Sequence, residues 1–188
     1  MGDDLFVKNL IEEIRDTVDK KKVKSLCNKI LKKCNFKSEK DLQNISALAT
    51  WLYVYEYYDE MLEVCDLLRD MEFSGDYNIW FNPDMVMCLK SRVLRKRGLI
   101  QESQVIIDKI NEHRHPELYE NLVESYEVDM DINIAEELKN RPKSLADGWR
   151  FCKLQSAIRY REAGSFPIPD ETFDNDIREL VAILKQVK

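Results

Sequence analysis

Mostly apolar residues recur along this chain in steps of three and four, and the same arrangement occurs four times. In each copy a first stripe of such residues is followed, nine residues after its end, by the start of a second stripe. Steps of three and four place side chains on one face of an α-helix. The four copies begin at Val7, Ile45, Met87 and Tyr119, and their second stripes begin at Val23, Met61, Ser103 and Ala135. The pattern predicts an all-α chain of antiparallel helix hairpins.

Short joins between the stripes set the expected boundaries. Asp19 is a suitable N-terminal cap for the second helix, and Gly98 is expected to break the third pair. We expect a single domain over residues 1–188, with hairpins at about 4–35, 39–72, 83–111, 116–141 and 145–187.

The third hairpin is expected to begin at Asn82 and Pro83. A capping side chain followed by proline is typical of the first turn of a helix. Residues 73–81 are then expected to form a loop that exposes Tyr77 and Trp80.

Residues 51–58 could form either a strand or a helix followed by a turn. Their alternating aromatic and β-branched residues are typical of a strand. Strong helix formers lie on both sides, at 47–49 and 60–68, and no Gly or Pro turn separates them from this segment. These flanks favour a helix that ends in a turn.

The repeated hairpin pattern resembles a tetratricopeptide repeat. In that family a large residue, Leu-Gly and Tyr lie on the first helix, and a small residue opens the second. The closest match is 48–52 with 58–63, the next is 97–103, and the resemblance covers roughly 5–142. It implies a right-handed superhelical stack of four to five hairpins, a TPR-like α-solenoid. An irregular helical bundle is the alternative.

In such a stack, the first helix of each hairpin lines the concave face. On the second hairpin this assigns Ser46, Thr50 and Tyr53 to that face. The resemblance implies a protein- or peptide-binding module, and the residues expected to bind are Tyr53, Arg92, Arg95, Lys96, Glu117, Glu120, Glu124 and Glu127.

The four glutamates form an acidic row, because their spacing places them on one helix face. Residues 117–137 contain no Lys or Arg. Three interpretations remain open: a groove for a basic peptide or protein surface, internal pairing with the basic cluster of Arg92, Arg95 and Lys96, or a solvated helix face.

Composition narrows the class of protein. The formal net charge of −6 argues against nucleic acid as the main partner, since such binders usually carry a basic excess. Eight lysines without an acid in residues 20–37 are better explained as the solvent side of a helix than as a phosphate or RNA site. No apolar stretch is long enough to span a membrane. Five cysteines without a CxxC pair indicate reduced thiols in a cytoplasmic protein.

Chemical motifs are sparse. The only two histidines are His113 and His115, which cannot complete a metal site alone, so we expect no metal and no cofactor. No phosphate-binding loop or nucleophile motif is present, so we expect no enzymatic activity. Two alternatives remain: a small-molecule-binding or enzymatic bundle, and an inhibitor or immunity-type protein that blocks a basic target. The pocket of the bundle would use Tyr53, Tyr55, Tyr57 and Trp149.

Overall fold

A computed structural model describes most of the N-terminal part of the chain and isolated positions further on. The described ranges are 2–17, 19–34, 38–73 and 75–113. Eight further positions, all helical, are described at 155, 158, 159, 175, 178, 181, 182 and 185.

Six helices account for the regular structure of the described ranges, so the all-α prediction is confirmed. They are α1 (Gly2–Arg15), α2 (Lys20–Leu31), α3 (Glu39–Val54), α4 (Tyr58–Asp66), α5 (Tyr77–Lys96) and α6 (Ile100–Asn111). The expected hairpin at 116–141 lies outside the described residues, and the one at 145–187 is described at the eight isolated positions only. No described helix is both long enough and apolar enough to cross a membrane.

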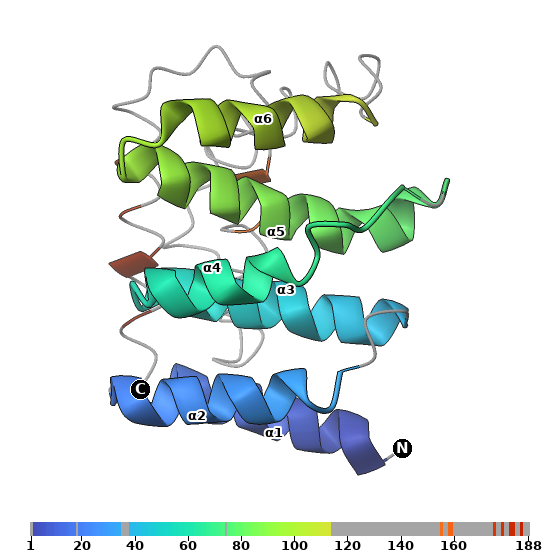
Figure 1. The fold of residues 1–188 in the computed structure, drawn as a ribbon. Helices are drawn as coiled ribbons and strands as arrows, with labels where there is room; N and C mark the ends of the chain where they lie inside the picture. The colour runs from blue at the N-terminus through green and yellow to red at the C-terminus, as the bar shows by residue number, and fades with distance from the viewer. Residues whose placement is uncertain are drawn as a thin grey trace, which may run out of the picture.

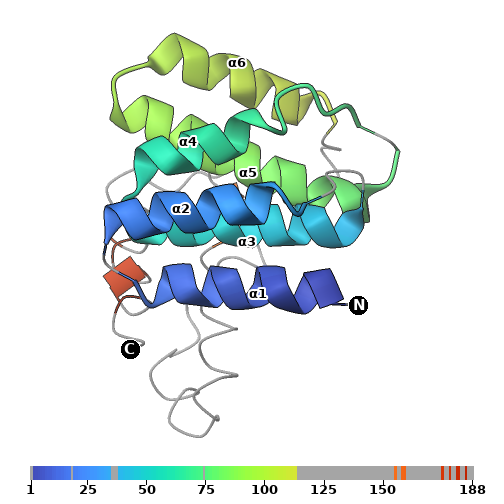
Figure 2. The same ribbon diagram turned by 60° about the horizontal axis from the view of Figure 1, so that its bottom comes forward.

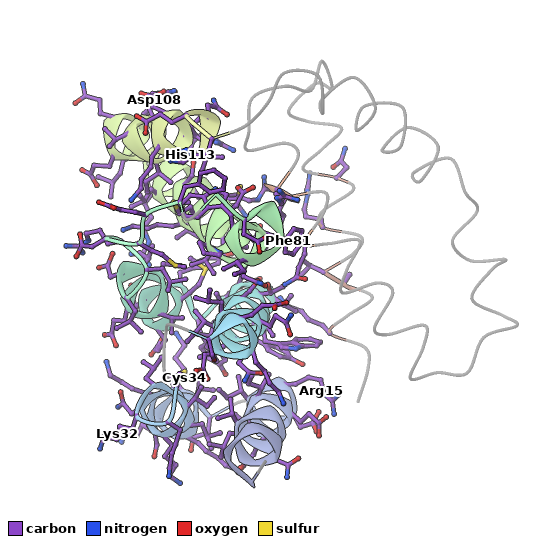
Figure 3. All side chains as sticks on the ribbon, turned by 90° about the vertical axis from the view of Figure 1, so that its right-hand side faces the viewer. Arg15, Lys32, Cys34, Phe81, Asp108 and His113 are labelled. Carbon is purple, nitrogen blue, oxygen red and sulfur yellow. The ribbon has the colours of Figure 1, made fainter. Side chains whose placement is uncertain are left out.

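The helices form three antiparallel pairs stacked in tiers: α1 with α2, α3 with α4, and α5 with α6 (Figures 1 and 2). Figure 3 looks along the helices. Lys32 at the end of α2 and Asp108 of α6 lie on one side, and Arg15 of α1 and Phe81 of α5 lie on the other. One layer therefore contains α1, α3 and α5, and the second contains α2, α4 and α6. In the first layer, α3 contacts both α1 and α5.

The repeated apolar positions form the core that joins the tiers. The second-stripe residues Val23, Met61 and Ser103 are at most 3% exposed. The first stripes are buried as well, at Val7, Leu10, Ile11, Ile14, Ile45, Leu48, Ala49, Leu52, Met87 and Leu94. The lysines of α2 lie on its exposed side, as expected for an amphipathic helix.

Helix termini follow the local signals in two of the expected places. Asp19 caps α2, because its carboxylate accepts hydrogen bonds from the backbone N–H groups of Lys21 (2.9 Å) and Lys22 (3.5 Å). Residues 51–58 contain the end of α3, a turn at 55–57 and the start of α4, so the interpretation as a helix followed by a turn is confirmed.

The start of the third pair differs from the prediction. Helix α5 begins at Tyr77, six residues before Pro83, and Trp80 N–H already donates to the Asp76 carbonyl at 2.9 Å. Trp80 is only 3% exposed and packs edge-on against Phe73, with ring centroids 5.6 Å apart. The expectation of a loop exposing Trp80 is therefore wrong. Burial of this large ring favours the extra turn despite the backbone hydrogen bond that Pro83 cannot donate.

The turns that end α3 and α5 have the same hydrogen-bond pattern. Tyr57 N–H donates to Leu52 O at 2.9 Å, and Leu99 N–H donates to Leu94 O at 3.0 Å. This six-to-one bond defines a Schellman motif, which requires a left-handed residue just before the donor. The left-handed residue is Gly98 (φ 78°) after α5 but Glu56 (φ 64°) after α3.

Replacing Gly98 with alanine should destabilise the protein by about 1 kcal/mol, because only glycine adopts the left-handed region without a steric cost. A Cβ at this position would meet no atom within 4 Å, so the loss would come from the backbone conformation alone. The free energy of unfolding from urea titrations of Gly98→Ala measures this cost.

The matched substitution is Glu56→Gly. It places glycine at the left-handed position of the equivalent turn after α3. We expect its free energy of unfolding to equal or exceed the wild-type value. If Gly98→Ala and Glu56→Gly lowered the free energy of unfolding equally, the left-handed backbone conformation would not be the cause of the loss.

Candidate functional site

Polar side chains on the α1–α3–α5 layer meet residues from far along the chain. Ser46 and Thr50 of α3 are at most 2% exposed. Gln155 Nε2 donates to Thr50 Oγ1 at 2.9 Å and to Ser46 Oγ at 3.4 Å. Ser46 and Thr50 share one helix face, as expected, but the expectation that this face is open for a partner is wrong here. Gln155 covers it because buried hydroxyl groups require hydrogen-bond partners.

An ion pair with a buried carboxylate also joins the segment that contains Gln155 to α5. Asp84, 1% exposed, accepts a hydrogen bond from Arg159 Nε at 2.7 Å. The Arg159 guanidinium also lies 4.5 Å from the ring centroid of Phe81, and Cys88 Sγ lies 3.7 Å from the Arg159 carbonyl oxygen. Gln155 and Arg159 are four residues apart, so one helical face contacts both α3 and α5.

Three of the predicted binding residues line one cavity. Tyr53 of α3 lies beside Arg92 and Lys96 of α5 in a cavity of about 310 Å³. The other lining residues come from the α3–α4 turn, from the start of α4 and from distant described positions. They are Glu56, Tyr58, Arg178, Val181, Ala182 and Lys185. We call this space the inner cavity.

Side chains of the inner cavity hold each other in place. Arg92, only 3% exposed, donates from Nε to the Tyr53 hydroxyl at 2.7 Å. Lys96 Nζ lies 5.5 Å from the centroid of the Tyr53 ring, within the range of a cation–π contact. The rings of Tyr53 and Tyr58 are 5.9 Å apart. Burial raises the pKa of Tyr58 to about 12, so its hydroxyl remains protonated at neutral pH.

One carboxylate lines the inner cavity. Lys185 Nζ donates to Glu56 Oε1 at 2.9 Å. This hydrogen bond, together with the charges of Lys185 and Lys96, lowers the pKa of Glu56 below its ordinary value. Glu56 is therefore ionised at neutral pH and fixes the position of one of the four cations.

The other predicted binding residues are not brought into the inner cavity. Arg95 is exposed and does not line it. The acidic row of Glu117, Glu120, Glu124 and Glu127 lies outside the described residues, so its three interpretations stay predictions. In the alternative tyrosine pocket, Tyr55 stacks on Trp51 at 5.9 Å, Tyr55 and Tyr57 do not line the inner cavity, and Trp149 is outside the described residues.

A second concave surface lies between α4 and α6, on the opposite layer, and we call it the outer groove. Its volume is about 500 Å³. Apolar side chains from three helices and from the turn after α4 form most of its surface, namely Leu62, Leu68, Met87, Leu94, Val105 and Ile106. Val105 is 69% exposed, which is high for a valine.

Polar contacts link the helices near both ends of the outer groove. At the N-terminal ends of α4 and α6, Arg97 Nη2 donates to Asp59 Oδ1 at 2.7 Å. At their C-terminal ends, Lys109 Nζ donates to the Arg69 carbonyl oxygen at 2.8 Å. Along one wall, Lys90 Nζ donates to Asp66 Oδ1 at 2.5 Å. These contacts connect α4 and its C-terminal turn to α5, to the α5–α6 turn and to α6.

The described residues do not bring together three side chains of the types that bind metals. His113 instead packs against Phe73 and Trp80, with ring centroids 4.8 Å and 5.4 Å apart. Burial raises the pKa of Cys27 and Cys65 to about 12 and that of Cys34 to about 11. These thiols are therefore protonated and poorly nucleophilic at neutral pH.

Several residues that line the inner cavity and the outer groove were not predicted from the sequence. Glu56, Tyr58 and Lys185 reach the inner cavity only through the turn after α3 and through a contact 129 positions apart. Val105 gave one usable signal, since it is an apolar residue off the buried stripe of Ser103, Ile107 and Ile110. Such a residue on an amphipathic helix is expected to be exposed.

Comparison with known proteins gives one match. A family model described as "Family of unknown function (DUF6707)" matches residues 4–185. No curated protein and no solved structure matches the chain significantly.

Replacing Arg159 with glutamine should lower the free energy of unfolding by about 3 kcal/mol, because it leaves the buried carboxylate of Asp84 without this cation. The value lies at the low end for a broken buried pair, since the Arg159 side chain is 23% exposed. Urea unfolding measures the change. The double variant Asp84→Asn/Arg159→Gln should lose less than Arg159→Gln alone. Equal losses would show that the ion pair is not what stabilises the contact.

Replacing Lys185 with glutamine should lower the melting temperature at pH 7 but not at low pH. Because the folded pKa of Glu56 is depressed, its contribution is present above the unfolded pKa of about 4.3 and is lost as pH falls through the folded value. For this largely exposed pair the loss should stay below about 1 kcal/mol. Thermal melts of both proteins between neutral and acidic pH should converge at the acidic end. A constant difference would assign the loss to packing.

Proposed function

The chain belongs to the DUF6707 family of unknown function, and we propose that it is a protein-binding scaffold without catalytic activity of its own. The proposal is carried by one observation, the exposed apolar surface of the outer groove. Apolar patches with a polar rim are typical of protein–protein contact sites.

We propose that the three described tiers are part of a TPR-like stack that continues through residues 116–141, whereas the described positions between 155 and 185 pack across its α1–α3–α5 layer. Two features support this proposal. The turns after α3 and α5 are equivalent in their hydrogen bonds, and second-stripe residues are buried in all three pairs. Stacked repeats present grooves between neighbouring helices, which such proteins commonly use for binding.

An amphipathic helix of a partner protein is the proposed occupant of the outer groove. The nine residues of α4 extend over roughly 14 Å at 1.5 Å per residue, which is between two and three helical turns. A helix that docks over this length inserts apolar side chains at positions i, i+4 and i+7.

The charges around the outer groove fix the orientation of the proposed helix. Glu102 lies in the first turn of α6, and Arg69 and Lys109 lie toward the C-terminal ends of α4 and α6, where Asp66 is already paired with Lys90 and Arg69. A helix usually has acidic residues near its N-terminus and basic residues near its C-terminus. It would therefore dock antiparallel to α4 and α6, so that its basic end meets Glu102.

The acidic row at Glu117, Glu120, Glu124 and Glu127 is proposed as a second contact, for a basic segment of the partner. The spacing of the four glutamates on one helix face supports this contact. The free thiols of Cys27, Cys34, Cys65 and Cys88 support a reducing compartment such as the cytoplasm.

The test uses a synthetic 14-residue helical peptide with leucine at i, i+4 and i+7, glutamates near its N-terminus and lysines near its C-terminus. Fluorescence anisotropy should show saturable binding. Val105→Glu should weaken binding at least tenfold, because it places a charge in the apolar wall that α6 contributes, at a cost of about 1.4 kcal/mol or more. The melting temperature should hardly change, since Val105 is largely exposed.

Ile100→Glu is the matched control. Ile100 is 56% exposed on the same helix but does not line the outer groove, so binding should be unaffected. A second control peptide keeps the leucines and exchanges the glutamates with the lysines, and it should bind more weakly. Equal binding of the two peptides, or no loss in Val105→Glu, would rule out this docking mode.

A further inference from the structure

The outward face of α2 has an unusual pattern of charge. Helix α2 contains no acidic residue, and it packs on the core through Val23, Leu26, Cys27 and Ile30. Residues 21, 25, 28 and 32 follow one another in steps of four, three and four, so they form a line on the opposite side of the helix. Figure 3 shows Lys32 at the outer edge of this tier. We call this line, together with the neighbouring Lys29, the lysine face; its members, all exposed, are Lys21, Ser25, Asn28, Lys29 and Lys32.

Lysines on the flanks of α2 are paired with acids of the neighbouring helices. Lys22 Nζ lies 2.7 Å from Glu13 Oε1 of α1. Lys24 Nζ donates to Glu63 Oε1 of α4 at 3.1 Å. The protein therefore compensates the positive charge of α2 where this helix meets α1 and α4.

The lysine face is not compensated in this way. In the ranges that the structure describes, no acidic side chain pairs with Lys21, Lys29 or Lys32. Lys29 and Lys32 are three residues apart, and like charges at this spacing destabilise a helix. The chain has 35 acidic residues and 29 basic ones, so a shortage of acids does not explain the pattern. A partner that supplies carboxylates would relieve the repulsion.

We propose that the lysine face binds an acidic helix of a partner protein. Lys21 and Lys32 are eleven residues apart, which is about 16 Å or three turns along the helix axis. A partner helix with glutamates at i, i+4, i+7 and i+11 has the same spacing, so its carboxylates face the lysines when the two axes run side by side. The Ser25 hydroxyl and the Asn28 amide lie between the lysines and can donate further hydrogen bonds to these carboxylates.

The composition of the lysine face favours a protein over a nucleic acid or a membrane. Proteins that bind single-stranded nucleic acids usually combine basic residues with aromatic rings that stack on the bases. Helices that bind membranes usually insert large apolar side chains into the bilayer. The lysine face consists of lysine, serine and asparagine, so it offers positive charge and hydrogen bonds alone. These groups match the carboxylates of an acidic helix.

Fluorescence anisotropy with a labelled, alanine-based helical peptide tests the site on the full chain. The peptide has 14 residues and carries glutamates at i, i+4, i+7 and i+11. At low salt we expect saturable binding that weakens as salt is raised. An exposed ion pair changes an affinity by up to about fivefold, so Lys21→Gln/Lys29→Gln/Lys32→Gln should weaken binding at least tenfold. All three side chains are exposed, so this variant should fold normally, as circular dichroism can verify.

The matched control is Lys20→Gln/Lys22→Gln/Lys24→Gln. It removes the same number of charges from the same helix, but from side chains outside the lysine face, so it should keep most of the affinity. A peptide of the same composition with its glutamates spread around the helix should bind more weakly. Equal losses in the two triple variants, equal binding of the two peptides, or no saturable binding would overturn the proposal.

Titrations with oligouridine and with vesicles that contain phosphatidylserine test the other classes of partner. Neither should bind more tightly than the acidic peptide at the same salt concentration. Tighter binding that is lost in Lys21→Gln/Lys29→Gln/Lys32→Gln would assign the lysine face to RNA or to a membrane and overturn the proposal. The lining of the outer groove includes no residue of α2, so the tests of the two surfaces fail independently.

Discussion

Burial of a carboxylate on α5 is the constraint on which much of this structure depends. Asp84 is 1% exposed, and removing a carboxylate from water is costly unless a cation and hydrogen bonds accompany it. Arg159 supplies both from 75 positions away. Four residues before it, Gln155 satisfies the buried hydroxyl group of Thr50 on α3, and Ile158 between them is fully buried. Polar groups on two neighbouring helices thus bind a distant segment of the chain.

Within the stack, equivalent positions use different chemistry for the same packing role. Ile11, Ala49 and Ser91 occupy one position in the three first helices, and Val23, Met61 and Ser103 occupy one position in the three second helices. All six are at most 7% exposed. In the third pair the two serine hydroxyls form a hydrogen bond at 2.8 Å, where the other pairs place apolar side chains. The hairpin geometry therefore depends on buried volume and satisfied polar groups at these positions, more than on residue identity.

Local patterns predicted the parts of the fold that local physics determines. The stripes of three and four, the Asp19 cap and the Gly98 turn were all found at their expected places, because each depends on neighbours within a few residues. The start of α5 was not predicted, since the burial of Trp80 against Phe73 and His113 outweighs the local signal of Pro83. On the α1–α3–α5 layer, the sequence correctly predicted that Ser46, Thr50 and Arg92 face the same side of the stack. It could not predict that Gln155 covers Ser46 and Thr50, because no short-range pattern specifies a contact across more than 100 residues.

Helix α5 separates the outer groove from the inner cavity, and its own packing determines whether they influence each other. Lys90 and Leu94 face the outer groove, while Arg92 and Lys96 face the inner cavity. Between them, Leu89 and Val93 are fully buried. Binding at one surface changes affinity at the other only if both ligands discriminate between two arrangements of a shared element. A helix fixed on several sides by close-packed side chains has little freedom to adopt a second arrangement. The packing of α5 therefore keeps the outer groove and the inner cavity as separate features on the two sides of one helix.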